Sequence, residues 1–292
     1  MLPKEILKKI RRIEITTSKL VMDFLSGQYE SVFKGRGIEF DEVREYLPGD
    51  EIRSIDWNVT ARMGHPYVKK FVEERELTIM LILDMSPSSY FGTVKQLKMQ
   101  LAAEICSLLA LSAIRNNDKV GFIAFTDRVE KFVPPRKGLR HVLRVIREAL
   151  YFKPSGRGTD INAALEYLNK VSSHRTVAFV ISDFYAPDFK KTLSISNKRH
   201  DIVAITITDP KELELPPLGL LQLEDPETNK IFTLDTSNKK LRREYSDNAN
   251  KRIKARTALF NSVSVDSIDV RTDVPYAQSL FKFFRARERR MH

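Results

Sequence analysis

Five polar residues in three short segments are the side chains of this chain best suited to bind a ligand. They are Asp84, Ser86, Ser88, Thr159 and Asp183. All of them offer oxygen atoms, which are the ligands that hard cations such as Mg²⁺ prefer. Alternate residues of an extended loop point the same way, so the first three can face one point. The spacing therefore predicts a site for Mg²⁺, with Mn²⁺ or Ca²⁺ as alternatives.

The elements that must position these residues alternate between strand and helix. Predicted strands, several of them continuous apolar runs typical of burial on both faces, cover 77–84, 119–126, 176–183, 201–208 and 262–270. Predicted helices cover 95–115, 139–150, 161–171, 187–197, 239–260 and 276–287, and residues 130–133 are expected to form a short antiparallel edge. This order predicts an α/β fold with a doubly wound, mainly parallel, Rossmann-like sheet. In such a sheet, ligands bind beyond the carboxyl ends of the strands.

Three regions are expected along the chain. Residues 1–27 have the apolar stripe of an amphipathic helix, and residues 28–77 read as a small strand-rich arm. The α/β domain is expected to fill 78–292, with a loop and hairpin insertion at about 209–236, where prolines interrupt the pattern. Within the arm, 52–57 is predicted to be extended, and Trp57 is expected to anchor the arm against the domain.

Composition excludes several classes of protein. The 292 residues include 49 Lys and Arg against 38 Asp and Glu, a formal net charge of +11. Cys106 is the only cysteine, which excludes disulfide frameworks and cysteine-rich zinc sites. The sequence shows no signal peptide, no apolar run of membrane length and no G-x-x-x-x-G-K-[ST] motif of P-loop ATPases. We expect a cytoplasmic protein, with a peripheral position at the inner membrane as an alternative.

A basic stripe is a second candidate site. Arg140, Arg144 and Arg147 fall at i, i+4 and i+7 of one predicted helix. This face fits an acidic protein partner or nucleic acid, and equally a solvated surface. The basic N-terminal helix leaves two interpretations, packing on protein and lying on an anionic membrane, of which we favour packing.

At the five oxygen-bearing residues the chain resembles a known family. Asp84-x-Ser86-x-Ser88, Thr159 and Asp183 resemble the five-part metal-ion-dependent adhesion site (MIDAS) of von Willebrand factor A domains, and GTDINAAL at 158–165 is similar to that family's sequence around its threonine. Residues 33–76 and 225–245 resemble the bacterial domain-of-unknown-function family fifty-eight. The resemblance spans about residues 33–270.

The resemblance implies a fold, a site and a partner. The fold would be von Willebrand factor A-like. Ser86, Ser88 and Thr159 would coordinate the ion, and Asp84 and Asp183 would bind it directly or through water and hydroxyl groups. Members of the family are associated with AAA ATPases of the MoxR class and are regarded as adaptors, not enzymes. An acidic residue of a protein partner would complete the metal shell, and no small-molecule substrate is expected. Two departures are Pro87 inside the first loop and Phe184, where many relatives have glycine.

Two other functions stay open from the residues alone. A Mg²⁺-dependent hydrolase of phosphate esters would use the metal and the acid at the strand end, but no general base is evident. A nucleic-acid-binding protein would use the basic stripe, although we expect nucleic acid to be the weaker candidate. Thr159 or Asp160 also fits a simple role as the N-cap of the helix that begins at Ile161.

Overall fold

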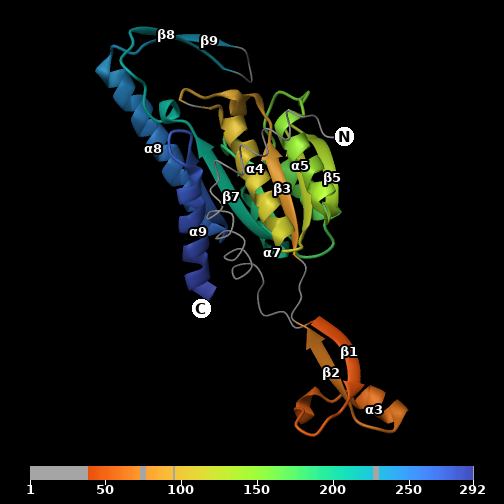
Figure 1. Ribbon diagram of the computed structural model, residues 1–292. Helices are drawn as coiled ribbons and strands as arrows, with labels where there is room; N and C mark the ends of the chain where they lie inside the picture. Colours follow the sequence, from red (N-terminus) through yellow and green to blue (C-terminus); the bar gives the residue numbers. More distant parts are fainter. Residues whose placement is uncertain (1–38, 73–76, 95, 226–229, 292) are drawn as a thin grey trace.

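The computed structural model describes residues 39–72, 77–94, 96–225 and 230–291, and its centre is a six-stranded sheet (Figure 1). The strands lie in the order β10 (Asp266–Arg271), β7 (Asp201–Thr208), β6 (Val177–Ser182), β3 (Thr78–Asp84), β4 (Lys119–Phe125) and β5 (Val129–Arg136). All neighbours pair in parallel except β5, which is antiparallel to β4 at one edge. The predicted doubly wound, mainly parallel α/β fold is confirmed.

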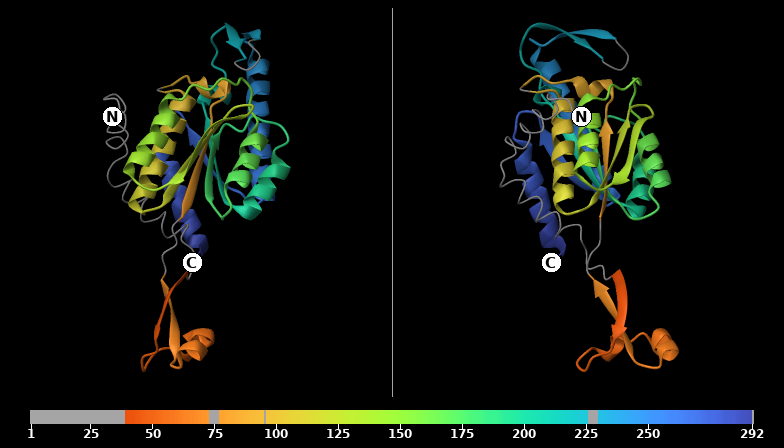
Figure 2. Two further views of the ribbon diagram at one scale, coloured as in Figure 1. Left: turned by 90° about the vertical axis from the view of Figure 1, so that its right-hand side faces the viewer. Right: turned by 45° about the vertical axis from the view of Figure 1, so that its right-hand side comes forward.

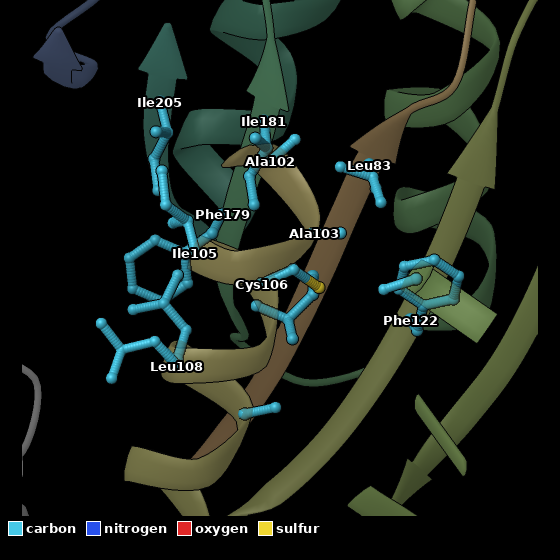
Figure 3. Packing of buried hydrophobic residues seen from close by; sticks show 14 of the residues in the cluster. Leu83, Ala102, Ala103, Ile105, Cys106, Leu108, Phe122, Phe179, Ile181 and Ile205 are labelled. Carbon is cyan, nitrogen blue, oxygen red and sulfur yellow. The ribbon is translucent and has the colours of Figure 1, made fainter. Parts of the chain in front are cut away.

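Helices cover both faces of this sheet (Figure 2). Alternate residues of β3 supply the two cores, because successive side chains of a strand point to opposite faces. Leu81 packs with residues of α4 (Lys98–Arg115), α5 (Leu139–Tyr151) and α9 (Tyr276–Met291). Met80 packs on the other face with residues of α6 (Ile161–Val171), α7 (Lys190–Arg199) and α8 (Lys239–Ser262). Figure 3 shows Cys106 of α4 within the first core, where it is fully buried, as expected for a packing residue.

The strand order reverses beside β3. The chain leaves β3 for α4 on one face and reaches β4, but it leaves β6, on the other side of β3, for α7 on the opposite face. The two connections therefore diverge at the carboxyl ends of β3 and β6. In α/β sheets, such a divergence marks the place where ligands bind. Asp84 and Asp183 stand at these two strand ends.

Among the element boundaries that differ from the sequence-based expectation, three are set by local features of the chain. Helix α7 begins at Lys190 instead of residue 187, because Asp188 has a positive φ of 49°, which is incompatible with a helix. Helix α8 continues to Ser262, so β10 begins only at Asp266. Between them Ser264 has a φ of 54°, which turns the chain.

The arm consists of β1 (Glu39–Glu45) and β2 (Tyr67–Val72), which pair antiparallel, with η1 (Ile52–Ser54) and α3 (Trp57–Met63) between them. The prediction of an extended segment at 52–57 is therefore wrong, because Asp56 caps a helix by accepting hydrogen bonds from Asn58 N and Val59 N. The expected anchoring by Trp57 is also wrong, since 66% of this residue is exposed. Figure 1 shows the arm apart from the sheet.

The insertion contains η3 (Pro210–Glu212) and an antiparallel hairpin of β8 (Leu220–Glu224) and β9 (Ile231–Asp235). It lies between β7 and α8, at the carboxyl edge of the sheet (Figure 1). The predicted N-terminal helix at 1–27 lies outside the described residues. Among the helices that the structure describes, none combines the length and the apolar character needed to cross a membrane.

Candidate metal and partner-binding site

Asp84 is the buried centre of the site, with 1% of its surface exposed. Its Oδ1 accepts a hydrogen bond from Ser86 N at 2.9 Å, and its Oδ2 accepts one from Ser182 Oγ at 2.5 Å. Backbone pairing continues past the strand, because Met85 N donates to Phe125 O at 2.9 Å. The carboxylate is therefore held by its own loop and by β6, while β4 fixes the backbone that follows it.

The loop after β3 brings three of the predicted ligands into one chain of hydrogen bonds. Ser86 Oγ lies 3.0 Å from Ser88 Oγ, and Ser88 Oγ donates to Asp183 Oδ2 at 3.0 Å. Pro87 does not divert this loop, because it opens the 3₁₀ helix η2 (Pro87–Tyr90), a position where its fixed φ is favourable. Four of the five predicted residues are thus neighbours in space.

Phe184 occupies a backbone position that favours glycine. Its φ is 59°, in the left-handed region that bulky residues rarely adopt. This turn lets Phe184 N donate to Ser182 Oγ at 2.9 Å and Tyr185 N donate to Asp183 Oδ1 at 3.1 Å. The Phe184 ring is buried and packs edge-on against Phe260 at a centroid distance of 5.1 Å. Packing therefore offsets the backbone strain that the side chain creates.

Thr159 reaches the same edge of the sheet on a separate loop. Asp160 N donates to Thr126 O at 2.7 Å, directly after β4. The Glu130 carboxylate accepts a hydrogen bond from Gly156 N at 2.7 Å, which fixes the other end of the loop. Asp160 caps α6 by accepting hydrogen bonds from the N–H groups of the first turn, so the capping role falls to Asp160. Thr159 itself is half-buried beside the strand that neighbours β3.

Lys98 is the site residue that sequence reasoning missed. It is the first residue of α4, and only 2% of it is exposed. Its Nζ donates to Asp183 Oδ2 at 2.7 Å and to Glu212 Oε1 at 2.6 Å. A signal exists in the sequence: Lys98 precedes Leu101 and Ile105 at helical spacing, so it occupies a position of the apolar stripe. A lysine in that position needs a buried carboxylate.

The site holds three carboxylates and one ammonium group. Burial, and then the charge of Asp183, raise the pKa of Asp84 to about 6. Burial also raises the pKa of Glu212, although the Lys98 ammonium opposes this effect. Burial alone would lower the pKa of Lys98, but the charges of Asp183 and Glu212 outweigh it and keep that pKa above its usual value. The arrangement therefore retains negative charge for a further cation.

The donor set fits a hard divalent cation. Adjacent ligands of an octahedral ion with bonds of about 2.1 Å lie about 3.0 Å apart. The Ser86–Ser88 and Ser88–Asp183 oxygen pairs have this separation, 3.0 Å in both cases. In the described part of the chain, no group of three or more His, Cys, Asp or Glu residues has the geometry to hold a metal. Hydroxyl groups and a pair of carboxylates are thus the ligands available, and Lys98 shares one of their oxygens.

The basic stripe lies apart from this site. Arg140, Arg144 and Arg147 are exposed on α5, as expected for a solvent-facing stripe. Helix α5 begins just after Arg136, which pairs with Val120 at the opposite end of β4 from the site. Arg147 donates to its neighbour Glu148 at 2.7 Å. The structure therefore does not bring the arginines to the predicted metal ligands.

Comparisons with known proteins identify the family. The model of a family described as protein of unknown function, DUF58, matches residues 42–255, well over half of the chain. The uncharacterized protein Rv1480 of Mycobacterium tuberculosis is 29% identical over 285 residues, which cover 96% of this chain and 89% of that protein.

Two solved structures are also similar to this chain. An aerotolerance-related membrane protein from Bacteroides fragilis has a TM-score of 0.48 and 17% identity, and the match covers 73% of this chain and 99% of that one. The SpRpn10 VWA domain has a TM-score of 0.37 and 15% identity, and the match covers 70% of this chain and 93% of that one. The extent of the family match decides the assignment: the chain belongs to the DUF58 family of proteins of unknown function.

Proposed function

We propose that this protein is a non-enzymatic protein-interaction module in which an acidic residue of a partner completes a divalent-cation site. The observation that carries the proposal is the chain of oxygen atoms from Asp84, Ser86, Ser88 and Asp183 at the point where the strand order reverses. Mg²⁺ is the proposed ion, with Mn²⁺ or Ca²⁺ as alternatives. Neutral hydroxyl ligands transfer little charge, so such an ion keeps its affinity for one more carboxylate.

The surface beside the site supports docking of a protein. Tyr90, Phe91 and Tyr185 are large apolar residues with exposed rings, and they come from the loops that carry the proposed ligands. The Arg252 guanidinium lies over the Tyr185 ring at 5.4 Å from its centroid. Aromatic residues and arginine are enriched in protein interfaces, and the basic group favours an acidic partner.

A phosphoester hydrolase has less support. The cavity lined by Asp84, Lys98, Asp183 and their neighbours has a volume of about 10 Å³. That is room for a single water molecule, whereas ligand pockets typically measure about 300–1,000 Å³. His174 and His200 precede β6 and β7 and so lie at the far edge of the sheet. His141 Nε2 donates a hydrogen bond to Val120 O at the start of β4, and His65 belongs to the arm. The described residues therefore offer no histidine as a general base at the site.

We propose further that the partner is a MoxR-type AAA ATPase, and that the protein is a cytoplasmic adaptor for it. The family resemblance implies this partnership. The geometry adds a specific requirement: the contact should depend on the divalent cation, because the partner's carboxylate would bind it.

Binding of the purified full-length protein to the MoxR-type ATPase from the same organism tests the proposal. Biolayer interferometry would compare Mg²⁺ with EDTA for the wild type, for Asp84→Ala and for Glu166→Gln, which removes an exposed carboxylate from α6. We expect binding that EDTA and Asp84→Ala abolish and Glu166→Gln preserves. Binding that ignores EDTA would refute metal dependence, and absence of binding in both buffers would refute the adaptor role.

A further inference from the structure

The Lys98 ammonium group contacts one of the proposed metal ligands. The Lys98 ammonium lies 2.7 Å from Asp183 Oδ2, the oxygen that also accepts the hydrogen bond from Ser88 Oγ. The Lys98 and Asp183 side chains are 2% and 3% exposed, so water contributes little to their solvation. A buried charge is costly unless it is paired, and here the ammonium is paired twice.

Neighbouring loops fix the second partner of Lys98. Glu212 Oε2 accepts a hydrogen bond from Asp209 N at 2.8 Å, which directs the Oε1 atom of Glu212 to Lys98. Asp209 is fully buried, and its carboxylate accepts hydrogen bonds from Thr93 N at 2.9 Å and Thr272 Oγ1 at 2.8 Å. These contacts tie η3 to the loop that leads into α4 and to the end of β10. The position of the ammonium group is therefore built into the fold.

We propose that Lys98 is a specificity-determining residue that lowers the affinity of this site for divalent cations, and that Glu212 partly offsets the effect. The inference rests on the metal binding in the proposed function. An ion bound by Ser86, Ser88 and Asp183 would share an oxygen with the ammonium, and two positive charges this close repel each other in a buried site. Without the ion, Lys98 neutralises Asp183, so the metal-free protein stays folded. The site would then fill only when the divalent cation is abundant or a partner adds its carboxylate.

Charge-neutralising variants of the full-length protein separate these effects. Lys98→Met keeps an unbranched apolar side chain and removes the charge, so we expect Mg²⁺ and Mn²⁺ to bind at least tenfold more tightly. Glu212→Gln removes a negative charge, so we expect weaker binding than in the wild type. The double variant should lie between the two single variants. Lys211→Met is the matched control, because it removes an exposed lysine from the same 3₁₀ helix as Glu212.

Isothermal titration calorimetry would measure the affinities, and the rise in Tm on adding Mg²⁺ would give a second readout. Lys98→Met leaves Asp183 and Glu212 without their ammonium partner, so its Tm in EDTA should be lower than that of the wild type. Its Tm should rise more than that of the wild type when Mg²⁺ is added. If Lys98→Met does not fold, the cation affinities of Glu212→Gln and of the double variant provide the test. Removal of Lys98 must tighten cation binding in the Glu212→Gln background as well.

The outcomes separate this inference from the proposed function. If a folded variant without Lys98 binds the divalent cation equally or more weakly, the inference about Lys98 is overturned, whereas the proposed function is unaffected. Tighter binding by Lys98→Met, together with ATPase binding that ignores EDTA, would support the inference and refute a metal-dependent contact. Failure of the wild type and all variants to bind Mg²⁺ or Mn²⁺ would overturn both.

Discussion

Asp84 should reduce the stability of the metal-free protein, and Asp84→Asn should therefore stabilise it. The folded protein raises the pKa of Asp84 from an ordinary value of 3.8 to about 6, first through burial and then through the charge of Asp183. Each pKa unit corresponds to about 1.4 kcal/mol, so ionised Asp84 reduces the free energy of unfolding by about 3 kcal/mol at neutral pH. An asparagine keeps the shape and avoids this cost.

The hydrogen bonds of Asp84 set the expected net gain. After the substitution, the amide oxygen of the new side chain can still accept from Ser86 N. The Ser182 hydroxyl now donates to Asp84 Oδ2, and in the variant it would face an NH₂ group and lose that acceptor. A lost hydrogen bond of this kind costs about 1 kcal/mol. We therefore expect Asp84→Asn to raise the free energy of unfolding in EDTA by roughly 1–2 kcal/mol at pH 7.5.

The pH dependence gives an independent check with a defined sign. Because the folded-state pKa lies above the unfolded value, the contribution of Asp84 is most favourable below pH of about 4 and is lost as the pH rises through about 6. Urea unfolding in EDTA at pH 5 and pH 7.5 should show a larger advantage of Asp84→Asn at pH 7.5. Asp183→Asn is the control, because it removes one of the two carboxylate partners of buried Lys98 and should destabilise the protein. An Asp84→Asn protein that is less stable than the wild type at pH 7.5 would refute the reasoning.

Three further changes test the parts that surround the site. Phe184→Ala removes a buried ring from its contact with Phe260 and should lower the free energy of unfolding by about 3 kcal/mol in urea titrations. A loss below about 1 kcal/mol would show that the ring contributes little packing energy or that its neighbours fill the space it leaves. Gly156→Ala places a Cβ at 2.1 and 2.2 Å from two side-chain oxygens. It should displace the loop that carries Thr159 and weaken Mg²⁺ binding in calorimetry, and unchanged affinity would exclude this loop from the site. The triple change of Arg140, Arg144 and Arg147 to Gln should leave the Mg²⁺ affinity unchanged, because these exposed residues lie on α5, away from the oxygen ligands. Loss of salt-sensitive binding to a nucleic-acid probe in this variant would instead support the nucleic-acid alternative.

Local sequence determined the sheet and the position of its acidic residues. The run LTIMLILD is apolar at successive positions and ends in Asp84, so it predicts a strand buried on both faces with a carboxylate at its end. The same pattern places Asp183 at the end of TVAFVISD. Because parallel strands end at the same edge of a sheet, the sequence predicts that both acids lie at that edge. In the arm, local sequence predicted less. Asp56 caps a helix where a strand was expected, and Trp57 is exposed where an anchor was expected.

Only the tertiary structure decided which groups meet at that edge. Asp183 reaches the loop of Ser88 because β6, and not β7, is the neighbour of β3, and strand order is not encoded in any local pattern. Lys98 meets Asp183 and Glu212 across 85 and 114 residues of sequence. Periodicity predicts the direction in which the Lys98 side chain leaves its helix. Which charges it meets depends on how the start of α4 packs against the loop after β6 and against η3. The sequence therefore predicts the oxygen-bearing residues, and the fold adds the Lys98 ammonium group, which contacts one of them.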